Sequence, residues 1–149
     1  MEKDYVWWEK TVEYKFILDA SREKDLQFAA PLSGTSERAA GDGVFASNAK
    51  IVLIEFKRSF NELDTEHDKF TNYDDAKEQL GEQDAHHFLI FGSCDGEGMN
   101  RDLTLHACTY FSRNDVASAL NVFDYGLEPS AFNTYLTELV GLKKGDERS

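Results

Sequence analysis

Two charged side chains interrupt an apolar stretch near the middle of the chain. Residues 51–57 read Ile-Val-Leu-Ile-Glu-Phe-Lys, so Glu55 and Lys57 follow four aliphatic residues. Such a stretch is typical of a central strand covered on both faces, where a buried carboxylate needs a cationic partner, hydrogen bonds or a metal ion. Side chains alternate along a strand, which predicts Glu55 and Lys57 on one face and Phe56 on the other. The pattern therefore predicts an acid and an ammonium group side by side at the C-terminal end of the strand, where open α/β sheets usually hold their chemistry.

A second carboxylate precedes this strand at a spacing that brings it back to the same place. Asp42 begins a short segment that ends in a turn around Asn48 and Ala49. An antiparallel hairpin with this turn pairs residues whose numbers sum to 97, and Asp42 then lies opposite Glu55, with Cβ atoms roughly 4.5–5.5 Å apart. A bulge or an odd-numbered loop would shift the pairing. The register predicts two convergent carboxylates beside Lys57, and a metal ion that neutralises both would account for the cost of burying them.

The rest of the chain predicts the elements that must position these residues. Helices are expected at 6–18, 61–80 and 114–125 and from residue 129 through a stripe that ends at residue 140. Strands are expected at 26–32, 51–57, 86–91 and 102–111, and the segment from residue 42 to the turn at 47–49 is the hairpin partner of 51–57. Glu9 and Glu13 share a face of the first helix, with a solvated pair beside Lys10 as the alternative. His67 is interpreted as a packed core residue. The order predicts one α/β domain over residues 1–145, built on a mixed central sheet, with an additional antiparallel strand, two C-terminal helices and a disordered tail at 146–149.

Charge and composition limit the classes of function. The 149 residues carry a net charge of −12, and residues 61–142 hold sixteen Asp or Glu against four Lys or Arg, whereas residues 1–60 are almost balanced. An acidic chain does not fit a non-specific nucleic-acid binder, which presents a basic face. No stretch has the apolar length of a membrane helix, the charged start does not resemble a signal peptide, and two irregularly spaced cysteines fit free thiols. We therefore expect a cytoplasmic protein that does not act at a membrane.

The motif and the element order together resemble a known family. Asp42 is followed thirteen residues later by Glu55-Phe56-Lys57 at the end of an apolar strand. This is similar to the PD-(D/E)xK nuclease superfamily, whose restriction-endonuclease-like core has the same αβββαβ order. The resemblance covers about residues 6–91. Gly41 stands where the family commonly has proline, a departure that it tolerates, and Gln79 is a weak match to the glutamine of the exonuclease branch.

The resemblance implies metal-dependent hydrolysis of phosphodiester bonds, with Mg²⁺ or Mn²⁺ as the cofactor and DNA as the expected substrate. Asp42, Glu55 and the carbonyl of Phe56 would be the metal ligands, with Glu13 or Glu9 joining through water. The metal would polarise the phosphate and lower the pKa of a bound water, and Lys57 would orient that water or offset charge in the transition state. Three basic residues are expected to position substrate phosphates: Arg38, Lys50 and Arg58.

Other interpretations remain open on the sequence alone. A nuclease fold can lose its activity and persist as a binding module, and the acids of residues 61–142 would suit a basic protein partner. An active enzyme of this charge would need a separate DNA-binding subunit, a homodimer or a structured substrate to gain affinity. A third interpretation is an acidic mimic of nucleic acid. Glu55 and Lys57 as plain strand-end charges, and Asp42-Gly43 as an ordinary turn, form the structural alternative to all three.

Overall fold

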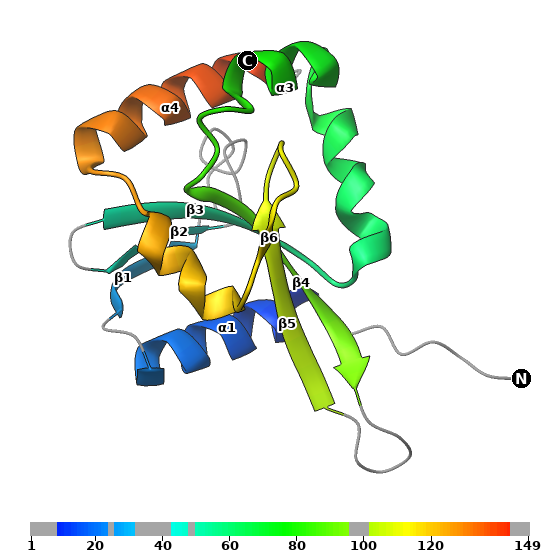
Figure 1. The fold of residues 1–149 in the computed structure, drawn as a ribbon, viewed down its shortest axis with the longest axis vertical. Coiled ribbons are helices and arrows are strands. Elements are labelled where there is room, and N and C mark those ends of the chain that lie inside the picture. The colour runs from blue at the N-terminus through cyan, green and yellow to red at the C-terminus, as the bar shows by residue number, and fades with distance from the viewer. Residues whose placement is uncertain (1–8, 24–25, 32–42, 48–49, 96–101, 144–149) are drawn as a thin grey trace, which may run out of the picture.

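A computed structural model describes residues 9–23, 26–31, 43–47, 50–95 and 102–143 (Figure 1). Asp42, Arg38 and the tail predicted at 146–149 lie outside these residues. The described residues form a single α/β domain around one mixed sheet, as the sequence predicted. Among them, no helix is long and apolar enough to cross a membrane.

The central sheet follows the chain from one edge to the other, in the order β1-β2-β3-β4-β5-β6. Its strands are β1 (Leu26–Pro31), β2 (Gly43–Ser47), β3 (Lys50–Lys57), β4 (His87–Asp95), β5 (Asp102–Thr109) and β6 (Asp115–Val116). Only β3 and β4 run parallel, and the other neighbouring pairs of the described sheet are antiparallel. The β3–β4 crossover requires a long connection, which the helices between them supply.

The register between β2 and β3 is the one that the sequence predicted. The described partners are Gly43 with Ile54, Phe45 with Val52, and Ser47 with Lys50, and the residue numbers of each pair sum to 97. No bulge interrupts this described pairing. The hairpin expectation on which Asp42 and Glu55 depend is therefore confirmed from residue 43 onward, while Asp42 itself lies outside the described residues.

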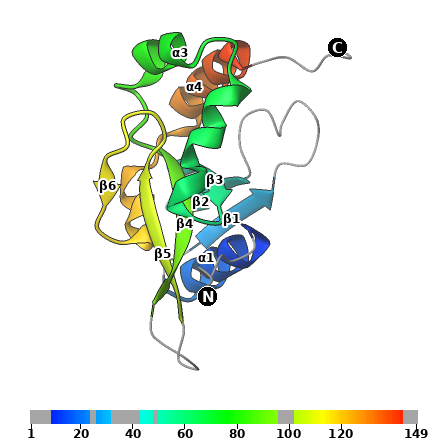
Figure 2. The same ribbon diagram turned by 90° about the vertical axis from the view of Figure 1, so that its right-hand side faces the viewer.

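Helices lie on both sides of this sheet (Figures 1 and 2). They are α1 (Glu9–Glu23), the 3₁₀ helix η1 (Phe60–Lys69), α3 (Tyr73–Leu80), the 3₁₀ helix η3 (Ala119–Tyr125) and α4 (Pro129–Leu142). α1 and η3 share a hydrophobic core with the face of β3 that carries Val52, Ile54 and Phe56. η1, α3 and α4 share a second core with the opposite face, which carries Leu53. The strand is thus covered on both faces, as its apolar sequence predicted.

Two predicted helices are wrong in detail. The helix expected at 61–80 is divided, because Phe70 is extended and Asn72 accepts a hydrogen bond from Asp75 N, which begins α3 as a new helix. The helix expected at 114–125 starts only at Ala119, because residues 115–116 form β6 at the sheet edge. These differences leave the αβββαβ order intact, since η1 and α3 together occupy the place of the predicted helix.

Candidate functional site

Glu55 and Lys57 are buried at the C-terminal end of β3. Glu55 is 4% exposed and Lys57 is 7% exposed. Alternation along the strand directs both side chains to the face that η1, α3 and α4 cover, away from α1. The parallel neighbour β4 pairs alongside, with Leu89 next to Glu55 and Phe91 next to Lys57. An acid and an amine thus lie together inside an apolar layer, so each needs an opposite charge.

The 3₁₀ helix η1 supplies these opposite charges. The ammonium group of Lys69 lies 2.9 Å from Oε2 of Glu55 and 2.7 Å from Oε2 of Glu66. Lys57 Nζ lies 2.6 Å from Oε2 of Glu66 and donates a hydrogen bond of 2.8 Å to Oγ1 of Thr65. We call Glu55, Lys57, Glu66 and Lys69 the four-charge cluster. Two carboxylates and two ammonium groups balance its formal charge.

The cluster shifts the pKa values of Glu66 and Lys69 in the direction that keeps each of them charged. Burial alone would raise the pKa of Glu66, but the nearby Lys69 and Lys57 outweigh it and hold this pKa below its usual range. Burial alone would lower the pKa of Lys69, but Glu55 and Glu66 raise it above the ordinary lysine value. Both ions therefore persist at neutral pH in a poorly solvated place.

A chain of buried polar groups continues the cluster into the core. The Tyr110 hydroxyl donates a hydrogen bond to Oε1 of Glu66, and burial raises the pKa of Tyr110 well above its ordinary value, so the hydroxyl remains a donor. The Tyr110 ring stacks on His87 with ring centres 4.0 Å apart. His87 Nδ1 lies 2.7 Å from the hydroxyl of Tyr135 on α4. Tyr110 thus holds Oε1 of Glu66, while the two lysines contact its other oxygen, Oε2.

Glu13 lies on the other side of the sheet from Glu55. It is 4% exposed and pairs with Lys10 of the same helix at 3.2 Å. The neighbouring residue Val12 packs against the sheet in the α1 core. To bind the same metal as Glu55, Glu13 would have to reach past the end of the sheet. A metal-binding role for Glu13 stays a prediction. Glu9 belongs to α1, and its side chain lies outside the part of the chain that is described.

Two of the predicted phosphate-binding residues, Lys50 and Arg58, lie in the described part of the chain at opposite ends of β3, and the third, Arg38, lies outside it. Lys50 begins the strand and lies 3.6 Å from Oε1 of Glu128. Lys57 ends the same strand about 23 Å away, at a rise of about 3.3 Å per residue. Arg58 follows directly, and its Nε donates a 2.9 Å hydrogen bond to Glu62. Arg58 is thus beside the four-charge cluster, whereas Lys50 is at the far end of the strand.

Sequence reasoning missed Glu66 and Lys69, although a signal for them exists. Leu63, Glu66 and Phe70 recur at the three- and four-residue spacing of one helix face, and Leu63 and Phe70 are buried. A carboxylate on such an apolar stripe is itself a sign of a buried charge, and Lys69 is three residues away. His67 was expected in the core, but its side chain is 45% exposed and its ring stacks on Tyr73 with ring centres 3.9 Å apart.

The described carboxylates of the cluster face ammonium groups. Oε2 of Glu55 contacts Lys69 Nζ, whereas Oε2 of Glu66 contacts both Lys69 Nζ and Lys57 Nζ. Mg²⁺ is usually held by one or two carboxylates, with waters and substrate phosphates filling the remaining positions. Within the described ranges, no group of three or more His, Cys, Asp or Glu residues is placed to hold a metal ion. The described part of this site therefore offers two carboxylates whose charge is balanced by two ammonium groups, and a metal ion there would need further ligands.

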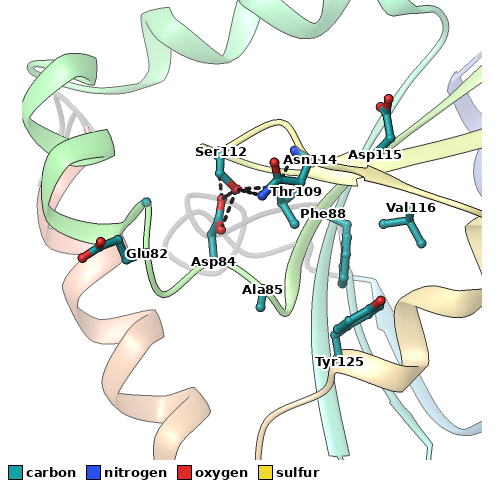
Figure 3. A pocket seen from close by; sticks show the side chains of 11 residues that line it. Glu82, Asp84, Ala85, Phe88, Thr109, Ser112, Asn114, Asp115, Val116 and Tyr125 are labelled. Atoms are coloured by element: carbon teal, nitrogen blue, oxygen red, sulfur yellow. Dashed lines mark hydrogen bonds between the residues drawn. The ribbon is translucent and has the colours of Figure 1, made fainter.

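A separate pocket of about 490 Å³ lies between the α3–β4 connection, the β5–β6 turn and η3 (Figure 3). Its polar wall centres on Asp84, which is 3% exposed and accepts 2.8 Å hydrogen bonds from the backbone N–H groups of Phe111 and Ser112. Phe88 and Tyr125 form an apolar wall. Glu82 and Asp115 add two acids, and none of the lining residues is basic. This pocket is acidic and lies apart from the four-charge cluster.

Comparisons of this chain with protein-family models, with curated proteins and with solved structures find no match.

Proposed function

We propose that this protein is a metal-dependent nuclease that hydrolyses phosphodiester bonds, with DNA as its substrate and Mg²⁺ or Mn²⁺ as its cofactor. The observation that carries the proposal is the burial of Glu55 and Lys57 on one face at the end of β3. This strand forms a hairpin with β2 in which the numbers of paired residues sum to 97, as the motif requires. Apolar sequence alone gives no reason to bury two charges there. The αβββαβ order that the resemblance required supports the same proposal.

The proposed ligands are Glu55, the carbonyl of Phe56 and Asp42. When bound, the metal would polarise the scissile phosphate and activate the attacking water. Lys57 is proposed to offset the negative charge that develops on the phosphate, because its ammonium is held in a fixed position by Thr65 and Glu66. Arg58, with a side chain 43% exposed beside the cluster, is proposed to contact substrate phosphate.

Partners and location belong to the same proposal. A net charge of −12 repels DNA, so affinity would come from a DNA-binding subunit, a homodimer or a structured substrate. We place the protein in the cytoplasm, and the free, buried thiol of Cys108 is compatible with that reducing compartment.

Removing either charged residue of β3 should abolish cleavage. We expect Glu55→Gln and Lys57→Met each to lower the rate of Mg²⁺-dependent DNA cleavage by about 10²–10³-fold, because each removes a charge that acts at the reacting phosphate. The assay follows nicking of supercoiled plasmid and degradation of labelled single strands, and excess EDTA should stop both. Glu78→Gln and Lys77→Met, two exposed changes on α3, are the matched controls. Full activity in the β3 variants, with circular dichroism showing an intact fold, would rule out this assignment.

A second function, binding of a basic protein partner by an inactive nuclease fold, is favoured by the acidic pocket. Its lining combines Glu82, Asp84 and Asp115 with the aromatic rings of Phe88 and Tyr125. An arginine side chain offers a matching positive charge and a flat surface for an aromatic ring.

An arginine-rich peptide is the probe for this second function. We expect fluorescence anisotropy to show binding that weakens steeply between 50 and 300 mM salt and falls about tenfold in the double variant Glu82→Gln/Asp115→Asn. Asp74→Asn and Glu78→Gln, made together on α3, remove the same charge elsewhere. Equal losses in the two double variants would mean that the pocket has no specific role.

A further inference from the structure

A row of aromatic side chains leads away from the C-terminal end of β3. Phe91 on β4 pairs with Lys57, and His106 on β5 pairs with Phe91, so the three side chains lie on one face of the sheet. The Phe91 and His106 rings are stacked, with ring centres 5.4 Å apart. The ring of Phe60, at the start of η1, meets Phe91 edge-on with ring centres 5.7 Å apart. We call Phe60, Phe91 and His106 the aromatic row, and it begins one strand away from Lys57.

Both ends of this row are exposed to water. Phe60 is 66% exposed, and His106 is exposed as well. A single exposed apolar side chain needs no explanation, but Phe60 belongs to a set of three rings in contact. Oγ of Ser93 lies 2.7 Å from Nε2 of His106, a hydrogen bond that holds the ring in place. Phe91 is half-buried and packs against the second core. The row is therefore an aromatic surface that rigid elements hold in position.

We propose that the aromatic row stacks on unpaired bases of single-stranded DNA and thereby holds the substrate beside Lys57. The inference rests on the proposed nuclease function, and it names the form of DNA that this site accepts. An internal base pair of a duplex is covered on both faces by its neighbours, so an aromatic side chain stacks on a base only where the strand is unpaired.

The charge of the protein favours stacking as the source of affinity. The chain carries a net charge of −12, which repels phosphates. Arg58, two residues before Phe60, donates a 2.9 Å hydrogen bond to Glu62, so a phosphate competes with a carboxylate for this cation. Stacking requires no basic surface, because every base presents a π face to an aromatic ring. An acidic protein with exposed aromatic rings therefore binds a single strand better than a duplex.

Binding of labelled oligonucleotides in EDTA tests the proposal without cleavage. The first probe is a single strand of thymidines, and the second is the same strand annealed to its complement. The third is a strand of abasic sites, which keeps the phosphates and lacks the bases. We expect fluorescence anisotropy to show binding of the single strand at least about tenfold tighter than binding of the other two probes. Equal affinity for the three probes overturns the proposal.

Variants of Phe60 assign this binding to the aromatic row. Phe60→Ala should weaken binding of the single strand about tenfold at both low and high salt, because stacking involves no net charge. Phe60→Trp should keep the wild-type affinity, whereas Phe60→Leu, which is apolar but has no π face, should match Phe60→Ala. Tyr14→Ala is the matched control, because Tyr14 is 60% exposed but belongs to α1, which packs on the other face of the sheet. Wild-type affinity in Phe60→Ala, or an equal loss in Tyr14→Ala, overturns the proposal.

A cross-link on the wild type covers the case in which the variants do not fold. A strand with 5-iodouracil in place of one thymine forms a bond under ultraviolet light to an aromatic side chain that stacks on it. Mass spectrometry of the digested product identifies the residue. We expect Phe60 or His106, and a cross-link to any other residue contradicts the inference.

Cleavage with Mg²⁺ is scored separately from binding. Binding of the single strand that depends on Phe60, without cleavage by the wild type, would refute the nuclease proposal alone. Cleavage by the wild type, with no preference for the single strand and no effect of Phe60→Ala, would refute this inference alone.

Discussion

Replacing Glu66 with alanine is expected to lower the free energy of unfolding by about 3–5 kcal/mol. Glu66 is 1% exposed, and its carboxylate is in contact with Lys57, Lys69 and the Tyr110 hydroxyl. In the alanine variant Glu55 is the only carboxylate of the cluster that remains for two ammonium groups. Lys57 loses its carboxylate partner Glu66 and has little access to water. Breaking a buried ion pair by removing one partner costs more than the pair itself contributes, because the remaining charge stays desolvated.

Urea unfolding at pH 7 measures this loss, with Glu78→Ala as the exposed control expected to stay within about 0.5 kcal/mol of wild type. The double variant Glu66→Leu/Lys57→Met removes one charge of each sign and should recover a large part of the stability, because the apolar side chains no longer need partners. A loss under about 1 kcal/mol in Glu66→Ala would mean that water reaches the cluster and that the two lysines are solvated there.

The part of the fold that the sequence predicted rests on β3 and its neighbours. An unbroken apolar stretch fixes a strand that is covered on both faces, and strict alternation then assigns Phe56 to one core and Leu53 to the other. The β2–β3 register followed from the turn position alone, because a hairpin has one pairing for each loop length. These inferences are local, so neighbouring residues suffice for them.

The errors arise where a distant contact overrides local preference. Residues 115–116 precede a good helical pattern, but Val116 pairs with Ala107 at the sheet edge and the helix begins later. The turn between β5 and β6 is stabilised by a hydrogen bond from the backbone N–H of Asn114 to Oγ1 of Thr109. Nothing near residue 115 in the sequence announces an edge strand formed with residues several positions earlier.

Two of the four residues of the four-charge cluster were predicted from the sequence. Glu55 and Lys57 were found because they interrupt an apolar strand. Glu66 and Lys69 were not found, because residues 61–80 carry so many acids that one buried carboxylate among them does not stand out by composition. Glu66 differs from the solvated acids only in its spacing from two buried apolar residues, Leu63 and Phe70. That spacing places the three on one face only if the segment is helical, and the helix is 3₁₀ rather than α.

Acidification should destabilise the protein through two buried histidines. His86 and His87 are both 0% exposed. Burial lowers the pKa of His86 from 6.5 to about 4, although the backbone of Gln83 partly opposes the shift. Burial, helped by the positive charge of Lys143, lowers the pKa of His87 well below 6.5. Both rings therefore stay neutral in the folded protein at pH values where the unfolded chain is protonated.

The sign of the effect follows from this difference in protons bound. Between pH 6.5 and about 4 the unfolded state binds more protons than the folded state, so the free energy of unfolding falls as the pH falls. The stability is fully present above pH 6.5, and His86 alone should account for a loss of about 3 kcal/mol between pH 7 and pH 4. His87 adds to the loss. Glu66, whose pKa is lowered, contributes only below its ordinary value of 4.5.

The variant His86→Leu separates this contribution from that of the carboxylates. Leucine is apolar and cannot titrate, so the free energy of unfolding of His86→Leu should fall less steeply with pH than that of the wild type, with the gap widening below pH 6.5. Phe132→Leu is the control, because Phe132 packs edge-on against the His86 ring and has no titrating group. Its destabilisation should be the same at every pH. Parallel curves for the wild type and His86→Leu would mean that His86 takes up its proton inside the folded protein. The prediction that its buried ring stays neutral would then be wrong.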